Sequence, residues 1–257
     1  FFFFAAPAQE AKIVFSSSAK ETVLKRLTIL GLVLLIAAAT TLSAITVKVI
    51  KTGTAFAGAK PQKTIIIDAG HGGFDGGAVV NNINEKDINL KIALKVSFLL
   101  RLFGFNVIET RTDDSSTESD PTATISARKK SDLKNRLEIA KQNPDAIFVS
   151  IHLNKYPSSA PKGAQMFYSP NGDDSKILAE CMRQSVASVL QNDNKRQIKK
   201  GDKSTYLLYY SPIPTVIAEC GFMSNGTELV NLLNDKYQSQ MAFAITHGIL
   251  NYYAQSS

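Results

Sequence analysis

The stretch TIIIDAGHGGFDGGAV, residues 64 to 79, constrains the fold of this chain more than any other part of the sequence. The apolar residues Ile65 to Ile67 lead through Asp68 into a cluster of glycines, which is the pattern of a buried strand that ends in a loop. Open α/β sheets bind their ligands in the loops just past the carboxyl ends of strands. His71 lies in such a loop and is therefore a candidate functional residue, although this stretch alone also fits an ordinary tight turn with a surface histidine. A phosphate-binding loop is disfavoured, because no Lys-Ser or Lys-Thr pair follows the glycines into a helix.

Strands and helices alternate along the rest of the chain. Asn84 and Asp87 form a capping-box pattern at the start of an amphipathic segment that Gly104 ends, so a helix is predicted between Asn84 and Gly104. The polar, Ser/Thr-rich segment 112–131 is predicted to be a long surface loop. The alternation as a whole predicts an α/β sheet. Other strands are predicted at 105–110, 146–151, 163–169, 206–210 and 215–218, and other helices at 133–140, 175–190 and 237–253.

No charged residue occurs from Leu27 to Val47, and Lys25, Arg26 and Lys48 flank this apolar run. A helix of that length would span about 30 Å, the thickness of the hydrocarbon core of a bilayer. The run also lacks the polar stripe that a helix on a soluble core shows. We expect a retained membrane anchor that holds the following domain outside the cytoplasm, with secretion after signal cleavage as the alternative. The predicted parts are an N-terminal flank (1–26), a transmembrane or signal-anchor helix (27–47), a linker (48–62) and a folded domain (63–257).

The net charge of +7 is divided between +3 in residues 1–50 and +4 in the remainder. A modestly basic domain outside the cytoplasm suits an anionic polymer such as the cell wall. Nucleic acid would suit the same charge, but the predicted membrane segment argues against nucleic acid as a partner. The two cysteines, Cys181 and Cys220, are too few for a metal cluster or a disulfide framework, so both are predicted to be free buried thiols.

Two further strand ends and one helix start carry residues that suit metal chemistry. His152 and Glu219 each follow a predicted buried strand, and Glu85 lies in the first turn of the helix after His71. Two imidazoles and one carboxylate are a common ligand set for catalytic zinc, with a fourth position left open. A second carboxylate that is not a ligand is then needed to move a proton to the leaving group. His71, Glu85 and His152 are therefore candidate zinc ligands, and Glu219 is the candidate proton carrier.

Plainer interpretations of these residues stay open at this point. Glu85 could simply favour the helix dipole at the start of its helix. His152 could be a satisfied structural histidine in a strand. Glu219 could form an ion pair with Arg111 or Arg136. No serine-nucleophile signature such as G-x-S-x-G occurs in the chain.

Four blocks of the sequence carry a resemblance to a known family. DAGHGG-x-D-x-G, the Glu85-Lys86 pair, FVSIHLN and IAECGFMSN together resemble the signature of the zinc-dependent N-acetylmuramoyl-L-alanine amidases, the type-3 amidase family. The resemblance covers roughly residues 63 to 254. It implies a Zn2+ ion on His71, Glu85 and His152, with Glu219 as the catalytic carboxylate. The implied fold is a single three-layer α/β domain with a mainly parallel sheet flanked by helices.

The resemblance also implies a substrate and a biological setting. The substrate would be peptidoglycan, cleaved at the amide between N-acetylmuramic acid and L-alanine. The single predicted anchor, the absence of wall-binding repeats and the segment RKKSDLKNR look most like the germination-specific branch, which acts in spore-cortex synthesis on the way to muramic δ-lactam. An activating protein partner is possible in that setting, and its identity is left open. Asn154, Arg136 and Arg111 are candidates for substrate-binding or supporting roles.

Two other classes of function remain as alternatives. The domain could be a wall-binding module without catalysis, but such a module need not keep both the ligand set and Glu219. It could also be a zinc carboxypeptidase acting on peptide stems, which would use similar chemistry around the metal.

Overall fold

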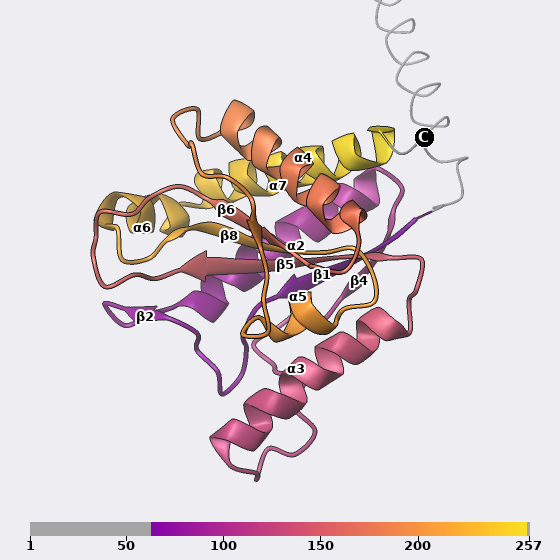
Figure 1. Cartoon of the computed structure of the whole chain (residues 1–257). Helices are drawn as coiled ribbons and strands as arrows, with labels where there is room; N and C mark the ends of the chain where they lie inside the picture. The colour runs from indigo at the N-terminus through magenta and orange to yellow at the C-terminus, as the bar shows by residue number, and fades with distance from the viewer. Residues whose placement is uncertain (1–62, 256–257) are drawn as a thin grey trace, which may run out of the picture. The chain divides into compact units, whose positions relative to one another are not determined.

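The computed structural model describes residues 63–255, which form a six-stranded sheet between two layers of helices (Figure 1). The strand order is β4-β1-β5-β8-β6-β7, and every neighbouring pair is parallel except β6 and β8. This confirms the predicted α/β fold with a mainly parallel sheet. The strands are β1 (Thr64–Ala69), β4 (Asn106–Glu109), β5 (Ile147–Asn154), β6 (Gln165–Tyr168), β7 (Lys199–Lys200) and β8 (Thr215–Phe222), and β2 (Val79–Val80) and β3 (Ile83–Asn84) form a separate two-stranded sheet.

Alternating side chains of the central strands supply two separate cores, one for each layer of helices. In β1, Ile65, Ile67 and Ala69 pack into the larger core, whereas Ile66 packs into the smaller one. The larger core contains residues of α2, α4, α6 and α7, and the smaller core contains residues of α3 and α5. The helices are α2 (Glu85–Leu102), α3 (Ile125–Lys141), α4 (Asp173–Val189), α5 (Tyr206–Tyr210), α6 (Gly226–Leu233) and α7 (Asp235–Gln255).

The prediction of a strand at 206–210 is wrong, because this segment is the short helix α5. Its three tyrosines favour a strand by local propensity. In the structure, however, Leu207 and Leu208 are both buried although they are adjacent, and a strand would direct them to opposite faces. The rings of Tyr206 and Tyr210 lie 4.8 Å apart, a contact that helical spacing of i and i+4 allows.

Helix α3 begins earlier than predicted and shortens the polar loop before it. The helix starts at Ile125 rather than at 133, because Thr124 caps it by accepting a hydrogen bond from the amide of Ala127. At the start of α2 the capping prediction is only partly right. Asn84 is the N-cap residue of α2, but its side chain accepts no capping hydrogen bond.

No helix within residues 63–255 is long and apolar enough to cross a bilayer. The predicted anchor at 27–47, the flank at 1–26 and the linker at 48–62 all lie outside the described residues.

Candidate metal centre

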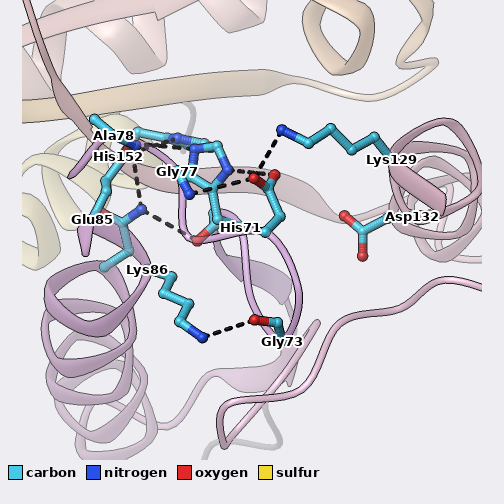
Figure 2. A network of polar contacts seen from close by, with 12 residues as sticks. His71, Gly73, Gly77, Ala78, Glu85, Lys86, Lys129, Asp132 and His152 are labelled. Carbon is cyan, nitrogen blue, oxygen red and sulfur yellow. Dashed lines mark hydrogen bonds and ion pairs between the residues drawn. The ribbon is translucent and has the colours of Figure 1, made fainter. Parts of the chain in front are cut away.

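The three predicted ligands lie together at the carboxyl end of the sheet. His71 lies in the turn after β1, Glu85 is the first residue of α2, and His152 is near the end of β5. Their nitrogen and oxygen ligand atoms are all within 4.8 Å of one another. Glu85 lies between the two imidazoles, with Oε2 at 3.3 Å from Nε2 of His71 and Oε1 at 3.0 Å from Nδ1 of His152 (Figure 2).

The His71 ring is held on its far side by a carboxylate. Nδ1 of His71 lies 2.7 Å from Asp75 Oδ2, and the Lys129 ammonium lies 2.9 Å from the other oxygen of Asp75 (Figure 2). Burial by itself would lower the pKa of His71, but Asp75 and Glu85 outweigh it and raise the pKa to about 9. With Nδ1 bonded to Asp75, the Nε2 atom is directed toward Glu85, which suits a ligand atom.

Asp75 and Lys129 are supporting residues that the sequence analysis did not assign. The aspartate could have been found from its place four residues after His71 in the glycine-rich turn. Lys129 gave no such signal, because its segment was predicted to be a loop and its contact with Asp75 joins residues far apart in sequence.

Glu85 is buried and makes several hydrogen bonds in addition to its contacts with the imidazoles. Oε1 accepts hydrogen bonds from the Leu153 amide at 3.0 Å and from the Asn89 side chain at 3.1 Å, and Oε2 accepts one from the Ala78 amide at 2.9 Å. Burial raises its pKa, but the neighbouring histidines lower it by a larger amount, so the net shift of the pKa is downward. Glu85 is therefore an ionised, oriented carboxylate, and the helix dipole does not account for these contacts.

Two buried arginines hold the backbone of the turn that carries His71. Arg136 donates hydrogen bonds to the carbonyl oxygens of Ala69 and His71, at 2.9 and 2.7 Å. Arg111 donates to the carbonyl oxygens of Ala69 and Gly70, at 2.9 and 3.1 Å. The arginines are 1% and 5% exposed, respectively, so both can support the turn and neither is open to a polymeric substrate.

Neither arginine forms an ion pair with Glu219, so that interpretation of Glu219 is wrong. Arg136 instead pairs with Asp68 and Asp132. Burial raises the pKa of Asp68, but the charge of Arg136 and hydrogen bonds from neighbouring hydroxyls lower it overall. Among residues 63–255 no ion pair of Arg111 is found, and its guanidinium is bonded to backbone oxygens.

Glu219 lies beside the candidate metal-binding cluster, and one of its carboxylate oxygens is buried without a hydrogen bond to the described residues. It pairs in register with His152 across the neighbouring strands β5 and β8, so the two side chains lie on the same face of the sheet. Its Oε2 atom is buried and makes no hydrogen bond to any described residue. Burial and the nearby charge of Glu85 raise the pKa of Glu219 to about 7, because the histidines offset them only in part.

The remaining predicted residues are distributed as follows. Asn154 ends β5, and its backbone oxygen accepts a hydrogen bond from the Met223 amide. This contact does not involve the side chain, so the role of Asn154 in substrate binding stays a prediction. Cys181 and Cys220 are free and buried, as predicted. Cys220 packs into the larger core, on the opposite face of β8 from Glu219.

A cavity of about 240 Å³ adjoins the cluster on its α3 side. Its walls include the two histidines, Asp75, Lys129 and Leu207. Buried, perturbed titratable groups beside a cavity are typical of an active site.

Comparison with known proteins identifies the family. Residues 65–251 match the family model described as N-acetylmuramoyl-L-alanine amidase. The germination-specific N-acetylmuramoyl-L-alanine amidase of Bacillus subtilis is 35% identical over 193 residues, which cover 75% of this chain and 81% of that protein.

Solved structures agree with this result. The CwlD amidase of Clostridioides difficile, solved in complex with the GerS lipoprotein, is 43% identical, with a TM-score of 0.72 and coverage of 76% of this chain and 100% of that one. The amidase AmiC2 of Nostoc punctiforme is 30% identical, with a TM-score of 0.65 and coverage of 76% and 99%. The chain therefore belongs to the N-acetylmuramoyl-L-alanine amidases, the enzymes that hydrolyse the amide joining N-acetylmuramic acid to L-alanine in peptidoglycan.

Proposed function

We propose that His71, Glu85 and His152 hold one zinc ion and that Glu219 moves the proton during cleavage of the amide. The observation that carries this proposal is the convergence of two imidazoles and one ionised carboxylate within 4.8 Å. This donor set matches that of catalytic zinc sites, which bind three protein ligands and leave a fourth position open. When bound at such a site, zinc acts as a Lewis acid on the carbonyl and lowers the pKa of water.

Each residue then has a separate task. Asp75 and Lys129 keep the His71 ring in one orientation, because the carboxylate holds Nδ1 and the ammonium holds the carboxylate. Glu219 accepts the proton of the attacking water and delivers it to the nitrogen of L-alanine as the C–N bond breaks. Burial raises the pKa of Glu219, and a raised pKa suits a carboxylate that first accepts and then donates a proton.

Metal analysis tests the ligand assignment. The purified chain should contain about one zinc ion, as catalytic sites of this type do. His71→Ala and His152→Ala should each lose most of the metal, whereas His247→Ala, which changes the histidine on α7, should keep it. Full zinc content in both His71→Ala and His152→Ala would refute the assignment.

Digestion of purified peptidoglycan tests the reaction. An amidase releases stems with a new amino terminus on L-alanine. A carboxypeptidase would instead release the last residue of the stem, and a wall-binding module would release nothing. Appearance of free L-alanine amino termini, and their loss after removal of zinc with a chelator, is the expected result.

We further propose that the enzyme acts in spore-cortex synthesis, where the muramic acid freed of its stem becomes muramic δ-lactam. Similarity to the germination-specific amidase of Bacillus subtilis supports this role. A lipoprotein partner is proposed because the CwlD amidase was solved together with the GerS lipoprotein. The proposed location is the outer side of a membrane, with residues 27–47 as the anchor. Cortex from cells that lack this chain should contain no muramic δ-lactam, and a normal δ-lactam content would exclude the role.

A further inference from the structure

A row of polar side chains continues past Glu219 onto the next strand. Glu219 on β8 is in register with His152 on β5 and with Gln165 on β6, and these three strands lie side by side in the sheet (Figure 1). Residues directly opposite each other on neighbouring strands direct their side chains to the same face. Gln165 therefore extends the surface of the proposed catalytic site on the side opposite His71.

Arg196 lies against Gln165 in a fixed orientation. Its Nη1 atom donates a hydrogen bond to Gln165 Oε1 at 2.9 Å, and its Nε atom donates one to the Lys162 carbonyl oxygen at 2.8 Å. Its guanidinium carbon lies 4.5 Å from the centre of the Phe222 ring. These three contacts hold the side chain in place although it is only partly buried.

Arg196 also forms no ion pair with any acidic residue in the described part of the chain, 63–255. Among the arginines of residues 63–255, four pair with carboxylates and Arg111 is buried among carbonyl oxygens, which leaves Arg196 as the partly exposed one without a counter-charge. The carboxylates nearby are already engaged. Asp193 pairs with Lys162 at 2.5 Å, and Glu228 accepts hydrogen bonds from the amides of Gly163 and Phe222.

The surroundings of Arg196 suit an anionic ligand. Arg196 lines a cleft of about 590 Å³ that contains three basic residues, with Lys162 and Lys195 as the others, and two acidic ones, Asp193 and Glu228. Guanidinium groups bind carboxylates strongly because the two groups match in charge and in hydrogen-bonding geometry. In peptidoglycan, the peptide stem carries ionised carboxylates.

Distances along the substrate agree with this placement. Neighbouring strands lie about 4.8 Å apart, so that Gln165 is one such step from Glu219. Each residue of an extended peptide spans roughly 3.5 Å. A carboxylate on the stem residue after L-alanine would therefore lie about two residues, or roughly 7 Å, from the cleaved bond and near Arg196.

We propose that Arg196, oriented by Gln165, binds the stem carboxylate nearest the cleaved amide and thereby selects acidic stems. The stem then runs from Glu219 across β6 toward the cleft, and the sugar lies on the side of His71. This inference rests on the proposed function of the site, because Glu219 marks the position of the cleaved bond.

Two muropeptides that differ at one group provide the test. In one substrate this carboxylate is free, and in the other it is a carboxamide. For the acidic substrate, Arg196→Met should raise KM about tenfold and leave kcat within about twofold, since the contact is a charge-assisted hydrogen bond away from the reacting atoms. For the carboxamide KM should hardly change, Arg196→Lys should recover part of the loss, and Arg183→Met on α4 should behave as wild type.

The outcomes separate this inference from the proposed function. An equal rise in KM for both substrates would mean that Arg196 only supports the fold, and no rise for either would mean that it does not touch the stem. In both cases the wild-type enzyme still cleaves, so only the inference fails. If wild type cleaves neither substrate at L-alanine, the proposed function fails and the inference fails with it. Calorimetry with the free stem peptide adds a readout that needs no catalysis, and Arg196→Met should weaken binding about tenfold.

Discussion

Glu219 differs from the other charged residues around the proposed metal centre because its buried Oε2 atom makes no hydrogen bond to any residue within 63–255. A buried carboxylate without partners is costly to keep ionised, which is why its pKa is raised to about 7. Glu85, at the start of α2, has a lowered pKa instead, because the neighbouring histidines stabilise its charged form. Their different environments support the proposal that Glu85 binds the metal and Glu219 transfers the proton.

Glu219→Gln tests that assignment. Glutamine keeps the size of the side chain but cannot carry a proton, so amide hydrolysis should fall by about 10² to 10⁴ while zinc is retained. Turnover of peptidoglycan and metal content are the two measurements. Loss of zinc together with activity would mean that the roles of Glu85 and Glu219 are reversed.

Gly77 is the residue at which backbone freedom matters most for the proposed ligands. It has φ +70°, and a Cβ there would lie 2.6 Å from a ring carbon of His71 and 2.7 Å from Glu85 Oε2. Gly172 has φ +92°, but a Cβ at that position would meet nothing within 4 Å. Both glycines therefore have a positive φ, but only Gly77 is closely surrounded by other atoms.

Gly77→Ala and Gly172→Ala form a matched pair of variants. Each should lower the free energy of unfolding by about 1–3 kcal/mol, because a residue with a Cβ is strained at a positive φ. Only Gly77→Ala should also weaken zinc binding, by about tenfold or more, because His71 and Glu85 must move apart. Competition with a chromogenic chelator measures the affinity. Equal zinc affinity in the two variants would contradict the packing around Gly77.

At the scale of elements, helix α3 is tied to the end of β1 through Arg136. This side chain reaches from α3 to Asp68 and to the turn that carries His71, and it also binds Asp132 on its own helix. Asp132 in turn holds the loop before α3, because it accepts a hydrogen bond from the Thr117 amide. The helix that was predicted as a short one at 133–140 therefore supports the turn that carries His71.

Arg136→Met should destabilise the protein by about 3–5 kcal/mol, because it leaves Asp68 buried without its counter-charge. Arg183→Met, which breaks a surface pair with Glu180, should change stability by no more than about 0.5 kcal/mol. Urea denaturation at pH 7 measures both values.

The stability that Arg136→Met loses should depend on pH in a defined direction. Asp68 has a lowered pKa in the folded state, so its interaction with Arg136 stabilises the protein above the unfolded value near 3.8 and is lost as pH falls through the folded value. Removal of Arg136 leaves burial to raise the pKa of Asp68 in the variant, so the difference between wild type and Arg136→Met should shrink as pH falls from that raised value toward the lowered wild-type value. A difference that stays constant down to pH 3 would exclude the ion pair as its cause.

At the scale of the whole molecule, the described domain and the predicted anchor can be separated by experiment. The charge-free run 27–47 is long enough for a bilayer, and no helix within the described domain has that property. We propose that the run tethers the domain on the outer side of the membrane.

A chain that begins at Lys60 should leave the membrane fraction and keep its activity on isolated peptidoglycan, because the metal centre and the cleft lie within residues 63–255. The full chain should fractionate with membranes, and protease added to protoplasts should digest its domain. Complete protection from protease would contradict the outward orientation.

The alternation of apolar strands and amphipathic helices was sufficient to predict an α/β sheet, because the two periodicities are local properties of the chain. The sequence also allowed the prediction of four site residues for the same reason: His71, Glu85, His152 and Glu219. Each follows a strand or starts a helix, and parallel strands bring such ends to one edge of the sheet. The motif blocks around these residues then indicated the family, and the comparisons confirmed it.

Tertiary structure decided the features that depend on contacts between distant segments. The helix at Tyr206–Tyr210 was mispredicted because packing of two adjacent leucines overrode local strand propensity. Lys129 and Asp75 are 54 positions apart, and Arg196 is 31 positions from Gln165, so no local pattern could pair them. The pKa of Glu219 depends on burial and on the charges around it, and both arise only when β8 is packed beside β5.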